Sequence, residues 1–135
     1  MIDTKTAPYA ALLLRVALGL LFLAHAGLKF FVFTPAGTVA FFSSLGLPGW
    51  FAYVVILWEV IGGIALILGV YTRVVALAMI PVLAGAIATV HGAKGFYTST
   101  DGWEFLALWI AAQLALAGIG DGPYALKPSR TTTNA

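Results

Sequence analysis

The sequence predicts an all-α membrane protein, a four-transmembrane-helix bundle with both termini cytoplasmic and a short interfacial helix in the first outer loop. Three observations lead to this fold class. Of the 135 residues, 61% are hydrophobic and 9% are charged, and mean hydropathy is +1.01, whereas soluble domains hold roughly 25% charged residues. Four segments are apolar enough to cross a bilayer. Basic residues concentrate on one side of these segments.

The four segments are each close to the length that a membrane requires. A helix needs about 20 apolar residues to cross a hydrocarbon core about 30 Å thick. The segments are Ala10–Phe33, Trp50–Val70, Val74–Ala93 and Trp103–Ile119. A soluble fold is excluded, because seven Lys and Arg plus five Asp and Glu are too few to cover its surface.

The connections between the segments indicate how they follow one another. Val70–Arg73 is short and predicts a tight turn, so the second and third segments form an antiparallel hairpin. Thr34 followed by Pro35 is typical of a helix N-cap with proline at the first helical position. Gly46 and Pro48 end this short helix, whose phenylalanines favour the membrane interface.

The chain is expected to form one domain. Residues 1–126 make the transmembrane domain, and residues 127–135 make a polar, flexible tail in which Thr131–Ala135 is disordered. The first and third segments each begin near an arginine and end with a histidine followed closely by a lysine, which hints at two related hairpins.

Basic residues predict the orientation. Five lie on the side of the termini and two on the other, which places both ends in the cytoplasm of a multi-pass protein of the cytoplasmic (inner) membrane. The five are Lys5, Arg15, Arg73, Lys127 and Arg130, and the two are Lys29 and Lys94. An alternative is a cleaved signal peptide ending at the A-x-A motif Ala24–Ala26, but the apolar run continues to Phe33, which favours a retained span.

Composition also excludes several kinds of chemistry. The chain has no cysteine, so it forms no disulfide and holds neither a thiolate-bound Fe–S cluster nor a covalent haem. Its basic residues are scattered singly, which argues against a nucleic-acid partner. This composition requires a membrane, so lipid is an expected partner of the chain.

Polar residues inside the membrane are the candidates for function. A charge at the bilayer centre costs several kcal/mol unless it is paired, protonated or hydrated. We expect Glu59 to pair with His25 or Lys29 and to form the floor of a polar pocket in the outer half of the bundle. The candidate pocket residues are His25, Lys29, Glu59, His91 and Glu104. The alternative is a buried ion pair that only fixes the register of two helices.

Simpler roles are the alternatives for other polar residues. His25 and His91 lack close ligand spacing, so no metal site is predicted, although a metal or b-type haem between them is an alternative. Arg15 and Arg73 are expected to reach the inner phosphates. Glu104 suits the first turn of a helix. Trp58 is expected to pack or to contact lipid.

Several short motifs resemble the DoxX-like family of membrane proteins. Arg15–Gly19, followed by Gly27-Leu28-Lys29, is similar to the family pattern R-x-x-L-G…G-x-x-K, with the glycine and the lysine one residue closer here. Ser44–Pro48 is similar to the family's outer loop. Glu59–Gly63 and Gly69–Arg73 resemble its E-x-x-G-G and G-x-x-T-R elements. The resemblance extends over about residues 15–126, and the order and spacing of the motifs give it its specificity.

This resemblance implies a redox setting. The family is named for the membrane subunit of an archaeal quinol oxidase and thiosulfate:quinone oxidoreductase, and other members resemble membrane anchors of redox-defence complexes. The expected function is therefore a quinone-linked subunit, associated with a redox or oxidative-stress complex, whose polar pocket holds a quinone headgroup. A redox protein is the expected partner, and the chain is at most the membrane subunit of a quinone-dependent oxidoreductase; no catalytic residue is identified.

Two rival functions remain open. One is a small proton-coupled transporter or channel that uses Glu59, which with four helices requires a homo-oligomer; the absence of clear broken helices argues against it. The other is a non-catalytic membrane anchor or assembly protein.

Overall fold

The computed structural model describes residues 1–129, and within them the only secondary structure besides an isolated β-bridge is helical. Three helices are long and apolar enough to cross a membrane, and a fourth apolar helix is shorter. The three cover Ala7–Val32, Trp50–Leu68 and Thr72–Lys94, and the shorter one is α6, Glu104–Ile119. These bounds agree with the four predicted segments to within a few residues.

The first and third spans are composite helices. The first is α1 (Ala7–Gly27) followed by the π-helix η1 (Leu28–Val32), and α3 (Trp50–Leu68) is the second span. The third comprises α4 (Thr72–Ala78), α5 (Ile80–Ala86), the π-helix η2 (Ile87–His91) and the 3₁₀ turn η3 (Gly92–Lys94). A further 3₁₀ turn, η4 (Thr98–Thr100), lies in the loop before α6.

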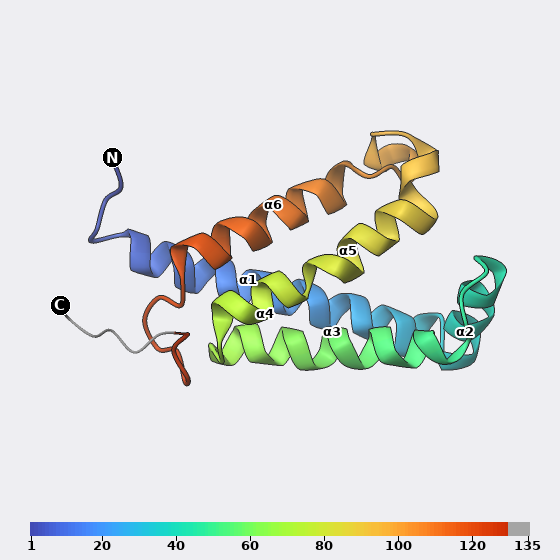
Figure 1. The fold of residues 1–135 in the computed structure, drawn as a ribbon, viewed down its shortest axis with the longest axis horizontal. Helices are drawn as coiled ribbons and strands as arrows, with labels where there is room; N and C mark the ends of the chain where they lie inside the picture. Colours follow the sequence, from blue (N-terminus) through green and yellow to red (C-terminus); the bar gives the residue numbers. More distant parts are fainter. Residues whose placement is uncertain (130–135) are drawn as a thin grey trace.

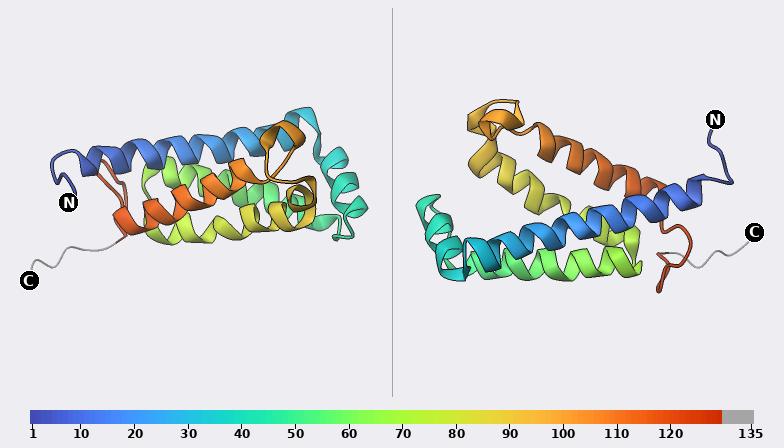
Figure 2. Two further views of the ribbon diagram at one scale, coloured as in Figure 1. Left: turned by 90° about the horizontal axis from the view of Figure 1, so that it is seen from above. Right: turned by 180° about the vertical axis from the view of Figure 1, so that it is seen from behind.

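The helices run up and down along the long axis of the molecule (Figure 1). The start of α1 and the end of α6 lie at one end, here called the terminal end, and α2 (Pro35–Ser44) lies at the opposite end, here called the loop end. α1 packs along α3, α4 packs on both α3 and α6, and α5 packs on α6. Toward the loop end, α5 and α6 therefore diverge from α1 and α3 (Figures 1 and 2).

Glycines allow α1 and α3 to approach closely. A Cβ added to Gly19 would lie 2.7 Å from the carbonyl oxygen of Gly63, and one added to Gly63 would lie 2.9 Å from the carbonyl oxygen of Gly19. No side chain fits at either position without moving a backbone. Small residues at a helix crossing are a common device in membranes, where close backbone approach drives association.

The apolar core fills the space between the four long helices. Its buried residues come from all of them: Leu18, Phe22, Leu66, Ala76, Met79, Leu83, Leu106, Trp109 and Leu116. The sulfur of Met79 occupies the space that a side chain at Gly62 would need. The core thus depends on small residues of α3 facing large residues of the third span.

Arg15 lies in this core. Its side chain is 1% exposed. Nη1 donates to the carbonyl oxygens of Leu66 and Ile67, at 3.0 and 2.9 Å, and Nη2 donates to that of Pro123 at 3.2 Å. The expectation that Arg15 reaches the inner phosphates is therefore wrong. The last carbonyls of α3 have no partner within their own helix, and a guanidinium satisfies them better than lipid can.

Arg73 has a similar role at the end of α6. Its guanidinium donates to the carbonyl oxygens of Ala117, Gly118 and Ile119, at 2.9, 3.1 and 3.4 Å. The expected contact with phosphates is replaced by this cap. In each case an arginine on one span closes the C-terminus of the span that follows it in the chain.

The third span is interrupted between α4 and α5, at Met79. Pro81 has no backbone N–H and cannot bond to the carbonyl four residues earlier, so it interrupts a helix. Side chains from neighbouring helices donate to the carbonyls just before the interruption. Gln113 Nε2 lies 2.9 Å from the Ala76 oxygen, and Trp58 Nε1 lies 3.0 Å from the Ala78 oxygen.

Two expectations change with this interruption. The sequence showed no clear broken helix, but the third span is one. Trp58 does face outward, with 47% of its surface exposed, but it also supplies a hydrogen bond to the interrupted helix. The indole of Trp58 therefore has a structural role, which the sequence around it does not reveal.

The short helix α2 begins as predicted. Thr34 is its N-cap, and the hydroxyl oxygen of Thr34 accepts the N–H of Gly37 at 3.1 Å, with Pro35 at the first helical position. Gly46 has a φ of +82°, which suits glycine at the turn after the helix. Placement of α2 at the membrane interface remains a prediction.

The segment after α6 returns to the turn between α3 and α4, and the predicted tight turn there is confirmed. The N–H groups of Leu126 and Lys127 donate to the carbonyls of Leu68 and Gly69, and the Tyr71 N–H donates to the Lys127 carbonyl. The predicted flexible tail, 127–135, thus begins with a hydrogen-bonded residue. Residues 130–135, including the predicted disorder of Thr131–Ala135, lie outside the described residues.

Candidate functional site

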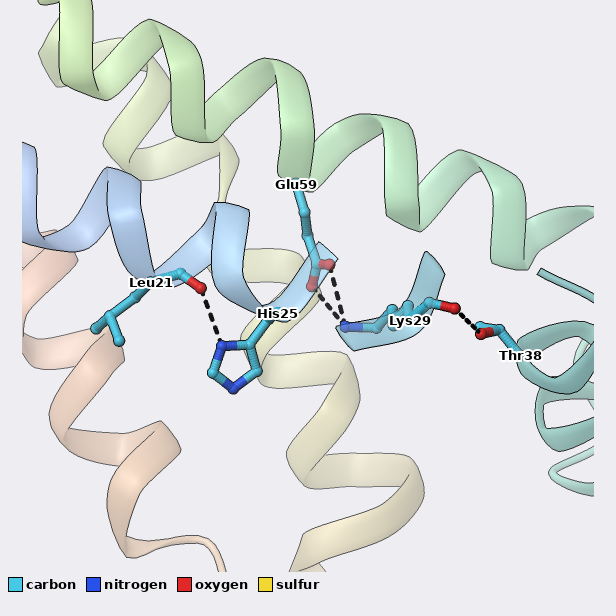
Figure 3. A network of polar contacts seen from close by, with 5 residues as sticks. All are labelled: Leu21, His25, Lys29, Thr38 and Glu59. Carbon is cyan, nitrogen blue, oxygen red and sulfur yellow. Dashed lines mark hydrogen bonds and ion pairs between the residues drawn. The ribbon is translucent and has the colours of Figure 1, made fainter. Parts of the chain in front are cut away.

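Lys29 and Glu59 form an ion pair inside the bundle. Lys29 belongs to the π-helix η1 and Glu59 to α3, and the Lys29 Nζ atom lies 3.0 Å from each carboxylate oxygen (Figure 3). Glu59 is only 3% exposed. The predicted pairing of Glu59 is confirmed, with lysine as its partner. Because both carboxylate oxygens bond to the ammonium group, the charge of each residue is compensated.

The π-helix places Lys29 and links it to α2. In a π-helix each turn holds more residues than in an α-helix, and such turns are common at functional sites. The Lys29 carbonyl oxygen lies 3.0 Å from the hydroxyl of Thr38, a residue of α2 that is 3% exposed. The short helix of the first loop is thereby tied to the backbone that carries the ion pair (Figure 3).

His25 lies one turn before Lys29 but contacts a different helix. Its Nδ1 atom is 2.9 Å from the Leu21 carbonyl oxygen, which can only accept, so Nδ1 carries the proton. Nε2 is then the atom that is free to meet a ligand. The ring lies 4.8 Å from Trp109 and 6.3 Å from Phe105, centroid to centroid. Figure 3 shows His25 pointing away from the Glu59 carboxylate.

Trp109 and Phe105 were not predicted as part of the site. They lie four residues apart on α6, and their rings are 5.5 Å apart. Trp109 is 3% exposed, whereas Phe105 is 38% exposed. The spacing of two aromatics on one helix face was the available signal, but only the packing of α6 on α1 shows that this face meets His25.

His91 and Glu104 support the loop between the third span and α6. The Nδ1 atom of His91 is 2.6 Å from the Asp101 carbonyl oxygen, and the Glu104 carboxylate accepts the N–H of Thr98 at 3.0 Å. Lys94 lies 3.7 Å from Asp101 at an exposed position. The structure thus joins Lys29 to Glu59, sets His25 against α6, and places the other two candidates in loop contacts.

Metal ligation has no support from this geometry. Within residues 1–129, no three His, Asp or Glu side chains are grouped as a metal ion would need. The Nδ1 atoms of His25 and His91 face different carbonyl groups. What the site does offer is an ammonium donor, a carboxylate, an imidazole nitrogen and two aromatic rings, a combination suited to a planar ring with polar substituents.

Comparison with known proteins identifies the family. The DoxX family model matches residues 10–92, a range that contains His25, Lys29, Glu59 and His91. The chain belongs to the DoxX family. The resemblance seen in the sequence is therefore confirmed, and DoxX membership together with three long apolar helices makes the chain a membrane protein.

A relative of this DoxX protein carries a name that refers to redox chemistry. The chain is 38% identical over 114 residues to a Bacillus subtilis (strain 168) protein named "Putative oxidoreductase CatD", covering 84% of this chain and 83% of that one. No solved structure matches. The match therefore extends over most of the length of both chains.

Proposed function

We propose that this DoxX protein crosses the cytoplasmic membrane four times, with both termini in the cytoplasm. The 16 residues of α6 rise about 24 Å at 1.5 Å per residue, somewhat less than a core about 30 Å thick. However, α6 packs against α1 and α4, which belong to longer spans. Lys5 and Lys127 lie toward the terminal end, which favours the cytoplasm for that end. The loop end, with α2 at the interface, then faces outward.

In this proposal, the outer half of the bundle binds a quinone ring. The observation that carries it is the Lys29–Glu59 pair, 3.0 Å apart, with the carboxylate 3% exposed. The oxygens of a quinone need hydrogen-bond donors, and an ammonium group beside a carboxylate supplies a donor and a proton route. His25 adds a nitrogen, and Phe105 adds a partly exposed ring face on which a planar ligand can stack.

The protein acts as a membrane subunit in a redox or oxidative-stress complex. Its side chains include no cysteine and no other group that stores electrons, so electrons pass between the bound quinone and a partner redox protein. The name of the Bacillus subtilis relative supports this setting. The role of Lys29, Glu59 and His25 is to bind and orient the ring and to exchange its protons.

Quinone extraction tests the proposal. The protein is purified in mild detergent from native membranes, and its bound lipids are extracted and quantified. We expect about one quinone per chain in the wild type, and loss of that quinone in Glu59→Gln. Glu104→Gln is the matched control, because it changes a carboxylate that contacts the loop, and it should retain the quinone. Wild-type protein without quinone would contradict the proposal.

Proton-coupled transport is the second candidate, because the interruption of the third span favours it. Discontinuous helices often mark substrate and ion sites in transporters, and this one lies on the span that packs against α3, which carries Glu59. Such a transporter would function as a homo-oligomer. Proton-dependent solute uptake into proteoliposomes, abolished by Glu59→Gln in a protein that binds no quinone, would favour this function. If neither activity is found and a partner co-purifies, the protein is an anchor or assembly factor.

A further inference from the structure

Four buried polar atoms in the core make no hydrogen bond of ordinary length and angle among the described residues. They are Arg15 Nε, Thr72 Oγ1, Trp109 Nε1 and Gln113 Oε1. Each of these side chains is at most 3% exposed. An unpaired buried polar atom costs roughly 1–3 kcal/mol, so such atoms in native proteins require an explanation. All four come from positions that face the interior of the bundle, on α1, α4 and α6.

Trp109 and Gln113 are complementary neighbours on α6. The Nε2 atom of Gln113 faces the Ala76 carbonyl oxygen, which only accepts, so Oε1 of the same amide is an acceptor. Trp109 Nε1 is a donor only. The two residues are four apart on one helix face, about 6 Å along the axis. No direct hydrogen bond joins the two side chains, and a water molecule between them would accept from the indole and donate to the amide oxygen.

Thr72 extends the series toward the terminal end. It lies four residues before Ala76, on the α4 face that Gln113 contacts, and its hydroxyl can both donate and accept. Thr72 also lies beside the carboxylate of Asp121, which is half-buried at the start of the segment after α6. The series therefore runs from a carboxylate near the terminal surface into the middle of the core.

At its other end the series meets the candidate site. Trp109 contacts the ring of His25 edge-on, with 4.8 Å between the centroids. His25 lies one turn from Lys29, whose ammonium group holds Glu59. Along this series, Thr72 lies beside Asp121, and Gln113 bonds to the carbonyl of Ala76, one turn after Thr72. Trp109 lies one turn from Gln113 and against the ring of His25.

We propose that this series, here called the inner polar track, binds a file of buried water molecules between Asp121 at the terminal end and the Trp109 indole, and that these waters carry protons to the Nε2 atom of the adjacent His25. The waters carry the proton, because the Trp109 N–H only donates and cannot relay one. The proposal rests on the proposed function and extends it, because it names the side from which the quinone site exchanges its protons. Water satisfies donors and acceptors that are too far apart to meet each other, and a chain of such waters transfers protons without any side chain moving. No electron transfer is involved in this step.

Exchange of the Trp109 indole proton tests the track. The chain has four tryptophans, so ¹⁵N-tryptophan labelling in lipid nanodiscs gives four indole signals, and Trp109→Phe assigns the one of interest. After transfer to D₂O we expect the Trp109 signal to disappear within minutes, although the side chain is 3% exposed. Protection lasting for hours would overturn the proposal, because it is the behaviour of a dry core.

Variants decide by which route water arrives. The double variant Thr72→Val, Gln113→Leu should slow exchange at Trp109 by about tenfold or more, since it removes two polar stations between Asp121 and Trp109. Thr89→Val is the matched control, because it removes a hydroxyl from an exposed position of the same span, and it should leave the rate unchanged. If the double variant folds and its Trp109 signal exchanges as fast as in the wild type, the proposal is overturned. If the double variant does not fold, the wild type alone decides, and slow exchange of its Trp109 signal overturns the proposal.

Quinone content separates the two proposals. The double variant should retain its quinone, whereas Glu59→Gln should lose it and still exchange at Trp109 as the wild type does. Rapid, variant-sensitive exchange in a protein without quinone would sustain the track and contradict the quinone site. Bound quinone with a protected Trp109 would do the reverse.

Discussion

The bundle consists of two hairpins that share a plan and differ in chemistry. The first hairpin is the span of α1 and η1 with α3, and the second is the span of α4, α5 and η2 with α6. In each, an arginine of the first helix caps the second helix, and the first helix contains a π-helical turn near the loop end. The sequence hint of related hairpins, from similarly placed arginine, histidine and lysine, thus has a counterpart in these matching caps and turns.

The difference between the hairpins lies in what the second helix offers the first. In the first hairpin, Glu59 of α3 pairs with Lys29, and the helices touch through Gly19 and Gly63. In the second, Gln113 of α6 bonds to the backbone of an interrupted helix. The first hairpin is close-packed and holds a buried ion pair, whereas the second has an interrupted helix and a buried neutral amide. We infer that the first supplies chemistry and that the second shapes the space beside it.

Breaking the ion pair should have the largest effect on this contrast. Lys29→Met leaves the Glu59 carboxylate buried without a partner, which costs roughly 3–5 kcal/mol, whereas Gln113→Met in the second hairpin removes one hydrogen bond, worth about 1 kcal/mol. Thermal unfolding in detergent measures both. The double variant Lys29→Met, Glu59→Met should recover much of the stability that Lys29→Met loses. If the double variant is no more stable than Lys29→Met alone, the two residues are not energetically coupled.

The second largest effect should be a difference in stability between variants of the two arginine caps. Arg15 is 1% exposed and bonds to three carbonyls, so Arg15→Leu should lower the free energy of unfolding by about 2–4 kcal/mol. Arg73 is only half-buried, and Arg73→Leu should cost about 1 kcal/mol. Unfolding curves of the two variants under one condition provide the comparison. Equal losses of unfolding free energy in the two variants would mean that burial of the arginine does not determine how much its cap stabilises the protein.

Adding one methyl group to each hairpin gives a smaller contrast. Gly63→Ala places a Cβ 2.9 Å from the Gly19 oxygen and 3.0 Å from a Leu23 carbon, and such overpacking costs about 1–3 kcal/mol. At Gly85 of α5 an added Cβ meets nothing within 4 Å, so Gly85→Ala should be neutral or stabilise the helix by up to about 1 kcal/mol. The same thermal assay applies, and a tolerated alanine at Gly63 would argue against the close helix crossing.

The smallest effect concerns pH at the terminal end, where both hairpins meet the last segment. Burial tends to raise the pKa of Asp121, but hydrogen bonds from the hydroxyl and N–H of Ser129, together with the adjacent hydroxyl and N–H of Thr72, outweigh it and hold the pKa below its ordinary value. A lowered folded pKa means that this stabilisation is present above the ordinary value of 3.8 and is lost as the pH falls through the folded pKa. Asp121→Asn should therefore flatten the loss of stability in this acid range.

Much of the fold was predictable, because hydropathy and segment length are enough to locate apolar helices that can cross a membrane. The four segments, the tight turn after Val70 and the cap at Thr34 all depend on local sequence, and the structure has them. The interruption of the third span was missed, although Pro81 inside that segment is its signal. Hydropathy does not depend on whether a residue has a backbone N–H group. An apolar segment can therefore be continuous in hydropathy although its helical hydrogen bonds are interrupted.

The candidate site was predictable only in part. The pairing of Glu59 follows from electrostatics, because a buried carboxylate needs a cation and few are present. Arg15 was assigned to lipid phosphates because the rule for arginine near a span end ignores unpaired carbonyls of a neighbouring helix. Trp109 and Gln113 were missed because their importance depends on which helices meet, and periodicity along one helix does not contain that information.

The bond from Arg15 to Pro123 spans 108 residues of sequence. During synthesis Arg15 is made long before Pro123, so this contact can form only after all four apolar segments have been made. The two bonds from Nη1 to α3 can form as soon as the second span is made, whereas the bond from Nη2 waits for Pro123. One guanidinium therefore couples the folding of the first span to that of the last, and its contacts are complete only after α6 is in place.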